Sequence, residues 1–291
     1  IFKLPDTVAN QIAAGEVVQR PASVVKELLE NAIDAGATKV KVVIRDAGKT
    51  LIYVEDNGKG MSHQDALICF ERHATSKLKT AEDLFHIATK GFRGEALASI
   101  AAIAHVELKT QLQGTDVGTR VAISGGRVDS HESCVVGGGS QLSVKNLFYN
   151  VPARRYFLKS DNVEWKHVLE EFTRVALVHP EVEMTLEHNG VVELHLLQQN
   201  YRQRIVKMMG NKFQEALVPI EEETHWLKVS GFVTKPEVSK KMRGDQYFFV
   251  NNRFIKHHYL HHAVQAVYQG IIAEGNFPAY FIHLEIDPEQ I

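Results

Sequence analysis

One stretch of the sequence places four polar side chains on a predicted amphipathic helix. Residues 26–37 read KELLENAIDAGA, so Glu27 and Asn31 stand one helical turn apart and share a helix face, beside Glu30 and Asp34. A carboxylate there could orient or deprotonate a water molecule. A neutral carboxamide oxygen suits Mg²⁺, which keeps several waters and also bonds to ligand phosphates. The solvated face of an ordinary helix explains the same spacing, so only further motifs can favour chemistry.

Two glycine-containing segments could contact a nucleotide. Residues 56–61 (DNGKGM) follow a predicted strand, where Asp56 could accept a hydrogen bond from an exocyclic amine and the glycines would admit a flat ligand; a plain turn is the alternative. Residues 91–97 (GFRGEAL) open a predicted helix whose first amides would attract an anion; a glycine-rich helix entry is the alternative. With the hydroxyls and the cation of residues 72–77 (RHATSK), the stretch 72–97 could cover a phosphate chain as a lid.

These segments lie among the elements of an α+β domain. Apolar residues of 21–35 recur at three- and four-residue steps, which predicts a helix between Pro21 and Gly36. Strands at 39–45 and 51–55 predict a hairpin. We also expect helices at 63–73, 95–104 and 163–178, two or three strands between 106 and 147, a mobile segment at 74–92, and a hairpin at 183–188 and 191–196. This alternation predicts a sandwich of one mixed sheet with helices on one face.

The pattern restarts after about residue 200. A short helix at 201–209 precedes strands near 217–233, 246–250 and 279–286 and a helix near 257–273, which predict a smaller α/β unit. We therefore assign residues 1–205 to a first domain and residues 206–291 to a second.

The composition is that of a soluble globular protein long enough for two domains. The chain has 291 residues, 44% hydrophobic and 23% charged, with a formal net charge of −2. No global basic field exists, so nucleic-acid binding would depend on local patches. Two cysteines argue against a disulfide framework and fit a reducing compartment. We find no signal peptide and no apolar run long enough to span a membrane, so we expect an intracellular protein. Because the chain starts without Met, we also expect it to be a fragment of a longer protein.

Other chemistries receive less support. The segment Gly48-Lys49-Thr50 resembles the end of a phosphate loop, but Val43 stands where that motif needs glycine. No Gly-x-Ser-x-Gly or Cys-x-x-Cys motif occurs. Two histidine pairs at i, i+4 spacing could bind a transition metal: His257 with His261, and His258 with His262. No carboxylate completes such a site, so polar surface residues are the better explanation.

The order of the motifs is more specific than any one of them. A Glu-x-x-x-Asn helix, a strand-terminal Asp-x-Gly-x-Gly, a Gly-x-x-Gly before a helix and a late Gly-Ser pair resemble the GHKL ATPases, which include gyrase-type topoisomerases, HtpG-type chaperones and histidine kinases. Five blocks further resemble the N-terminal region of the MutL family of DNA mismatch-repair ATPases. These blocks are residues 10–18 (NQIAAGEVV), 20–28 (RPASVVKEL), 72–77 (RHATSK), 91–97 (GFRGEAL) and 147–155 (LFYNVPARR).

The resemblance implies an ATP- and Mg²⁺-dependent site on a GHKL fold. Glu27 would be the general base and Asn31 the Mg²⁺ ligand. Asp56 would bind the adenine amino group, with Gly60 and either Thr119 or Ser140 close to the base. The remaining implied contacts are with the phosphates, at Arg93, Gly94, Glu95, Ala96 and Leu97, and in the lid, at Thr75, Ser76 and Lys77.

The resemblance also implies partners. ATP binding would order the lid and an N-terminal arm around residues 12–16, so that the chain dimerises with itself or a paralogous subunit. DNA phosphates would contact Arg253, in a Val-Asn-x-Arg segment, and Lys256, and a MutS-type mismatch-recognition protein would be a further partner. The expected location is the bacterial cytoplasm or the eukaryotic nucleus.

One departure concerns hydrolysis. The family has a lysine beyond an Ile-Asp-Pro-x-x-Val segment, and this chain stops at Ile291 within that segment. We therefore expect ATP binding to persist and hydrolysis to be impaired. Two other readings are a nucleotide-gated scaffold without hydrolysis and phosphotransfer to a histidine, the latter disfavoured because no acceptor helix precedes the domain.

Overall fold

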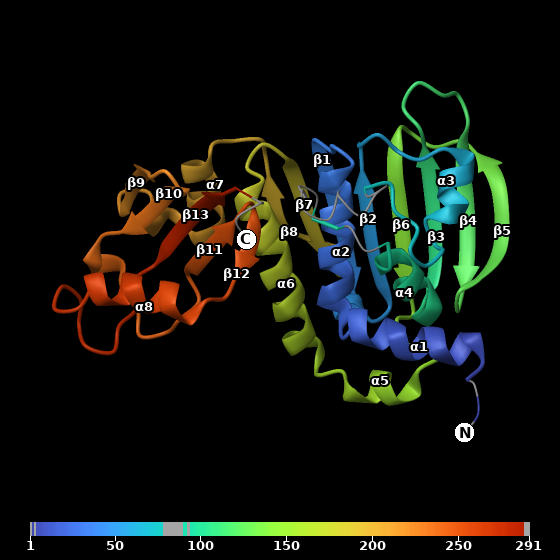
Figure 1. The fold of residues 1–291 in the computed structure, drawn as a ribbon, viewed down its shortest axis with the longest axis horizontal. Helices are drawn as coiled ribbons and strands as arrows, with labels where there is room; N and C mark the ends of the chain where they lie inside the picture. Colours follow the sequence, from blue (N-terminus) through green and yellow to red (C-terminus); the bar gives the residue numbers. More distant parts are fainter. Residues whose placement is uncertain (1, 3, 78–89, 92–93, 288–291) are drawn as a thin grey trace. The chain divides into compact units, whose positions relative to one another are not determined.

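The computed structural model describes residues 2, 4–77, 90–91 and 94–287 (Figure 1). The chain forms two compact units, one reaching residue 198 and one starting at residue 199, with residues 176–180 joined to the second. The predicted boundary after residue 205 would fall inside a helix of the second unit. We describe each unit by itself.

The first unit is built on an eight-stranded mixed sheet with the strand order β5-β4-β3-β6-β2-β1-β7-β8. All neighbouring strands are antiparallel except β1 and β7, which are parallel. The strands are β1 (Lys39–Arg45), β2 (Leu51–Asp56), β3 (His105–Gln111), β4 (Gly118–Ser124), β5 (Arg127–Cys134), β6 (Gly139–Lys145), β7 (Glu183–His188) and β8 (Val191–Leu196).

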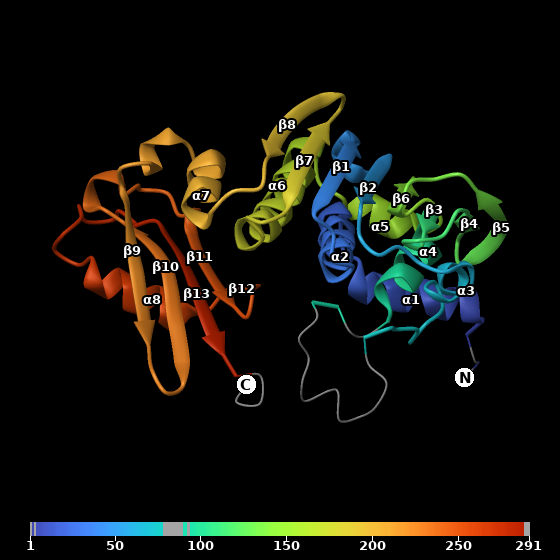
Figure 2. The same cartoon turned by 90° about the horizontal axis from the view of Figure 1, so that it is seen from above.

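Helices cover one face of this sheet (Figure 2). They are α1 (Asp6–Val17), α2 (Pro21–Asp34), α3 (His63–Ile68), α4 (Ala96–Ile103) and α6 (Asp161–Val178). Helix α5 (Pro152–Phe157) lies beside α1 and has no buried residue (Figure 1). The strands alternate accordingly: Ile52 and Val54 are buried under the helices, whereas Tyr53 between them is not. Trp165 of α6 stacks on His188 of β7 with ring centroids 3.9 Å apart. The predicted α+β architecture is therefore confirmed.

Helix α2 is favoured both by its apolar stripe and by the residues at its two ends. Pro21 occupies the first helical position, where a missing N–H costs nothing. Gly36 ends the helix with φ of +74°, a conformation that glycine adopts without strain. The stripe packs on the sheet and consists of Pro21, Ala22, Val24, Val25, Leu28, Leu29 and Ala32. Glu27, Asn31 and Asp34 lie off this stripe, along one edge of the helix.

Three sequence predictions differ from the structure. The region 105–145 holds four strands where we predicted two or three, because β5 (RVDSHESC) lacks the apolar alternation that marks a half-buried strand. Helix α3 ends at Ile68, well before residue 73, where His73 has φ of +64°. Helices α1 and α5 were not predicted as helices. The predicted mobile segment 74–92 lies largely outside the described residues.

The second unit is a five-stranded sheet with the order β12-β11-β13-β10-β9. Its strands are β9 (Leu217–Glu223), β10 (Leu227–Thr234), β11 (Gln246–Val250), β12 (Arg253–Ile255) and β13 (Tyr280–Ile286), and its helices are α7 (Tyr201–Met209) and α8 (His258–Val267). Ile205 of α7 packs in one cluster with Phe249, whereas Leu260 of α8 packs against a second cluster with Phe248. Successive residues of β11 thus enter different cores, as expected for a strand covered on both faces.

None of the helices in the part of the chain that the structure describes combines the length and the apolar character that a membrane crossing needs.

Candidate functional site

A row of polar side chains crosses four neighbouring strands of the first sheet. The register sets Asp56 of β2 opposite Ser140 of β6. Ser140 in turn lies opposite Thr110 of β3, and Thr110 lies opposite Thr119 of β4. Opposed residues point to the same face of the sheet. Each of these four residues stands two positions from a buried apolar residue of its own strand, so it points to the face that the helices cover. The row therefore forms the polar border of the apolar face beneath the helices.

Asp56 is the charged member of this row and is partly buried. Burial raises the pKa of its carboxyl to about 6; hydrogen bonds from the backbone amides of Gly58 and Ser140 act in the opposite direction, and nearby Glu55 raises it further. The Gly58 amide donates to Asp56 Oδ1 over 2.8 Å. The carboxylate is therefore a poorly solvated acceptor that a ligand N–H would stabilise.

Thr110 connects the row and was not singled out from the sequence. Its fully buried hydroxyl donates to the Gly139 carbonyl over 2.9 Å, lies 2.9 Å from Ser140 Oγ, and accepts from the Met61 amide over 3.0 Å. A polar residue that continues the inward alternation of β3 was the signal available in the sequence.

His63 is a second residue that the sequence analysis missed. Its Nδ1 lies 3.1 Å from Thr119 Oγ1, and its ring stacks on His131 with centroids 3.9 Å apart. Of the two hydroxyls predicted near the base, Ser140 therefore borders Asp56, whereas Thr119 is separated from Asp56 by the two strands β6 and β3 and contacts His63.

The glycines of the 56–61 segment have structural roles. Gly60 has φ of +68°, and a Cβ at this position would lie 1.9 Å from the Gln111 carbonyl oxygen. A Cβ at Gly58 would lie 2.8 Å from Ala35 Cβ, and the Lys59 amide donates to the Ala35 carbonyl over 3.0 Å. The loop after Asp56 is thus packed on the end of α2, which joins the polar row to the Glu27 helix.

The polar edge of α2 meets residues from the 72–94 region. Glu27 is partly exposed and lies 3.4 Å from Lys26 Nζ. Lys77 Nζ lies 3.2 Å from Asn31 Oδ1 and 2.5 Å from Asp34 Oδ2. Asp34, to which the sequence analysis gave no role of its own, has a side chain that is only 7% exposed and forms an ion pair with Lys77.

The predicted phosphate segment is only partly described. Gly94 has φ of +63°, and a Cβ there would lie 2.5 Å from the Ala74 carbonyl oxygen; its own carbonyl accepts from the His73 amide over 3.0 Å. Helix α4 begins at Ala96, one residue after the predicted start at Glu95, and continues through Leu97. Arg93 lies outside the described residues.

The remaining predicted phosphate and lid residues differ in exposure. The Thr75 hydroxyl accepts from the Lys77 amide over 3.1 Å, and Ser76 is exposed.

In the second unit, the two predicted DNA contacts follow a tight hairpin. Asn251 and Asn252 both have positive φ between β11 and β12, and the Asn251 side chain is bonded to the backbone of Ile286 at both ends of its amide. Arg253 and Lys256 are exposed just beyond this turn.

Nearby, the predicted histidine metal alternative receives no support. Among the residues that the structure describes, no three His, Cys, Asp or Glu side chains gather as a metal site. His261 is instead bonded to the Tyr280 hydroxyl.

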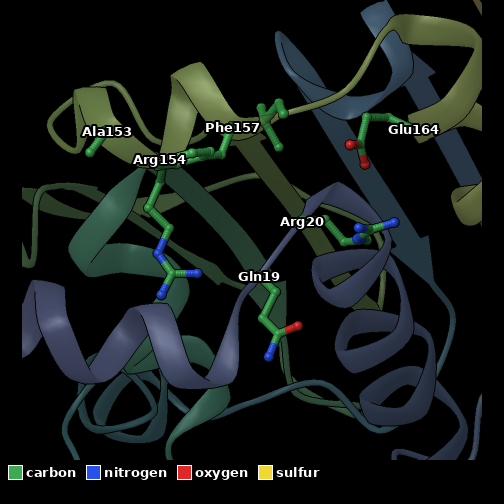
Figure 3. A pocket seen from close by; sticks show the side chains of 7 residues that line it. Gln19, Arg20, Ala153, Arg154, Phe157 and Glu164 are labelled. Carbon is green, nitrogen blue, oxygen red and sulfur yellow. The ribbon is translucent and has the colours of Figure 1, made fainter.

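A separate pocket of about 390 Å³ lies in the first unit near the start of α2 (Figure 3). It is lined by Gln19, Arg20, Ala153, Arg154, Phe157, Leu158 and Glu164. Arg154 extends from α5 over α1, where a Cβ at Gly15 would lie 2.5 Å from its Nη2. None of the residues predicted to bind nucleotide lines this pocket.

The fold and the site define a class of protein. A mixed sheet covered on one face, a strand-terminal Asp with a hydroxyl row, and a Glu-x-x-x-Asn helix in contact with both glycine segments are the features of a GHKL-type ATPase fold. In agreement, residues 19–136 match the family described as histidine kinase-, DNA gyrase B- and HSP90-like ATPase. The gyrase B subunit of Myxococcus xanthus shares the fold, with a TM-score of 0.64 at 10% identity over 98% of this chain and 87% of that one.

More specific matches identify the family within that class. Residues 205–291 match the DNA mismatch repair protein C-terminal domain family. The chain is 60% identical to the DNA mismatch repair protein MutL of Christiangramia forsetii over 288 residues, which are 99% of this chain and 47% of that protein. It also resembles the Aquifex aeolicus MutL ATPase domain complexed with ADP, with a TM-score of 0.69, 28% identity and 94% of each chain covered. The chain belongs to the MutL family, as its N-terminal GHKL-type ATPase region, and spans about half the length of the curated relatives it matches.

Proposed function

We propose that this chain binds ATP in the space bordered by Asp56, the polar edge of α2 and the start of α4. One observation carries the proposal: α2 contacts the loop after Asp56 through Ala35 and the 90–91 segment through Asp34. Segments separated by many residues thus converge on one helix. Asp56 would accept from the adenine amino group, and the ADP complex of the Aquifex relative supports a nucleotide ligand.

The donor set fits Mg²⁺ as well as a nucleotide. Asn31 offers a neutral oxygen that already has a cation, Lys77 Nζ, at 3.2 Å, so a positive charge is accommodated at this place. Asn31 would hold the ion together with ligand phosphates. When bound, Mg²⁺ would neutralise charge on the phosphate oxygens. Gly94, Glu95, Ala96 and Leu97 would supply backbone contacts at the start of α4.

Glu27 is the proposed general base for hydrolysis of ATP. It is one turn from Asn31 and partly exposed, so it can accept a proton from a water molecule that attacks the γ-phosphate. Arg93, Thr75, Ser76 and Lys77 would complete the phosphate contacts. We keep the nucleotide-gated scaffold as the second candidate, because Glu27 Oε1 lies 3.4 Å from Lys26 Nζ, and this ion pair competes with an attacking water for the carboxylate.

Steady-state hydrolysis tests this proposal in a chain extended to the length of its relatives. Replacement Glu27→Gln should lower kcat at least about 100-fold and leave the dissociation constant of ATP nearly unchanged. Glu30→Gln, on the same helix, is the control and should keep wild-type turnover. Equal turnover by wild type and Glu27→Gln would leave the scaffold function, whereas no ATP binding by the wild type would contradict both.

The proposal includes partners of the whole protein. ATP binding would drive dimerisation with a second copy or a paralogous subunit, with the segment 12–16 in the contact. Arg253 and Lys256 would contact DNA phosphates without sequence preference. A MutS-type protein would supply mismatch recognition, and Mg²⁺ and ATP together would act as a switch. Sedimentation with and without a non-hydrolysable ATP analogue tests the dimer: a constant molecular mass would contradict it.

A further inference from the structure

Asp34 receives three hydrogen-bond donors from outside its own helix. Lys77 Nζ lies 2.5 Å and the Gly91 amide 3.1 Å from its Oδ2, and the Lys90 amide lies 3.1 Å from its Oδ1. The side chain is 7% exposed, so these donors replace most of the water around the carboxylate. Hydrogen bonds to an ionised group are among the stronger ones in proteins, and a buried carboxylate without them would be costly.

The place of this carboxylate on α2 is locally unfavourable. Asp34 is the last residue of the helix, where the negative end of the helix dipole repels an anion and favours a cation. A carboxylate at this place works against helix stability. Its contacts with residues 77 and 90–91 therefore account for its presence better than helix stability does.

Asp34 also determines where Lys77 lies. The Lys77 ammonium group bridges Asp34 and Asn31, at 3.2 Å from the Asn31 oxygen. Gly91 packs against the same group: a Cβ at this glycine would lie 3.2 Å from Lys77 Nζ and 3.6 Å from Asn31 Oδ1. One carboxylate thus gathers a cation, a carboxamide and a tight backbone approach.

We propose that Asp34 is a positioning residue for the nucleotide site. It holds Lys77 beside Asn31 and ties the 90–91 backbone to α2 before nucleotide arrives. The inference rests on the proposed ATP site and deepens it, because Lys77 stands where a cation on Asn31 is expected. Lys77 must then move aside or share Asn31 when nucleotide and Mg²⁺ bind, and Asp34 keeps the ammonium group within reach.

Amide hydrogen exchange in the nucleotide-free protein tests the anchoring directly. Replacement Asp34→Ala should raise exchange at the Lys90 and Gly91 amides at least about tenfold, since both lose their acceptor. Asp34→Asn keeps one acceptor oxygen and should give a smaller rise. Glu30→Ala, on the same helix but paired with Lys26, is the control. Unchanged exchange at both amides in folded Asp34→Ala and Asp34→Asn proteins would overturn the inference.

Nucleotide affinity separates this inference from the proposed function. With ATP and Mg²⁺, we expect Asp34→Ala and Lys77→Met each to weaken binding about tenfold, and the double variant to be little worse than either, because the two residues act together. Fully additive losses, or wild-type affinity in both Asp34 variants, would overturn the positioning role and leave the ATP site intact. A wild-type chain that binds no ATP would instead overturn the proposed function.

Discussion

Asp56 and Ser140 lie opposite each other on β2 and β6, and the Ser140 backbone amide is one of two that stabilise the partly buried Asp56 carboxylate. These amides do not compensate fully for lost water, because the pKa of Asp56 is still raised to about 6. A carboxylate in this state gains from a further donor. The exocyclic amine of adenine would supply this further hydrogen-bond donor. The raised pKa of Asp56 in the ligand-free protein therefore supports adenine as its proposed ligand.

The raised pKa predicts how stability depends on pH without nucleotide. The folded state holds the Asp56 proton up to about pH 6, whereas the carboxyl has its ordinary pKa of 3.8 when unfolded. Between these values the folded state binds more protons, so this group lowers the free energy of unfolding as pH rises from 4 to 6. Asp56→Asn should remove that loss and be more stable than wild type at pH 7.5 by on the order of 1–2 kcal/mol.

Urea denaturation at pH 4 and pH 7.5 measures this difference. The variant should gain little at pH 4, where the wild-type carboxyl is protonated. An equal advantage at both pH values would contradict a titrating carboxyl as the cause.

The same position should control nucleotide binding. Asp56→Ala removes the only charged acceptor of the polar row and should weaken ATP binding at least about tenfold, measured by calorimetric titration. Glu55→Gln is the matched control, because Glu55 is the next residue on β2, faces the other side of the sheet and bonds to Gln141. Similar losses in both variants would indicate a general disturbance of β2.

Gly60 and Gly36 form a matched pair for stability. Both have positive φ, +68° and +74°, but a Cβ at Gly60 would lie 1.9 Å from a backbone oxygen, whereas nothing lies within 4 Å of one at Gly36. Gly36→Ala should cost about 1 kcal/mol from backbone strain alone. Gly60→Ala should cost about 3 kcal/mol or more, because the backbone must also shift. Thermal unfolding of both variants measures the difference, and equal costs would contradict the close approach to β3.

Charge reversal after the Asn251-Asn252 turn should weaken DNA binding. Arg253→Glu and Lys256→Glu should each lower affinity for duplex DNA of any sequence and reduce the slope of log affinity against log salt by about 1. Lys228→Glu is the control, because Lys228 Nζ on β10 lies 3.8 Å from Glu221 Oε1 on β9 in the same unit. Filter binding at several salt concentrations measures these slopes, and an unchanged slope would exclude a phosphate contact by that residue.

Local signals in the sequence determined much of the fold. The apolar stripe of α2, the hairpin of β1 and β2, and the hairpin of β7 and β8 were all predicted, because periodicity and turn residues act over a few positions. The start of α4 after Gly94 was predicted for the same reason. Strand β5 was not predicted, because its polar sequence has no alternation of apolar and polar residues.

Only the tertiary structure decided which distant residues meet. Periodicity assigns Asp56, Thr110 and Ser140 to faces of their own strands, but long-range pairing sets their register and hence the polar row. Likewise, the spacing of α2 put Asp34 on one edge with Asn31, yet its partners come from residues 77 and 90–91. The sequence by itself thus determined the motifs and the elements that carry them. Packing between segments far apart in the chain decided that Asp34 is a buried anchor, because burial depends on neighbours that local sequence does not specify.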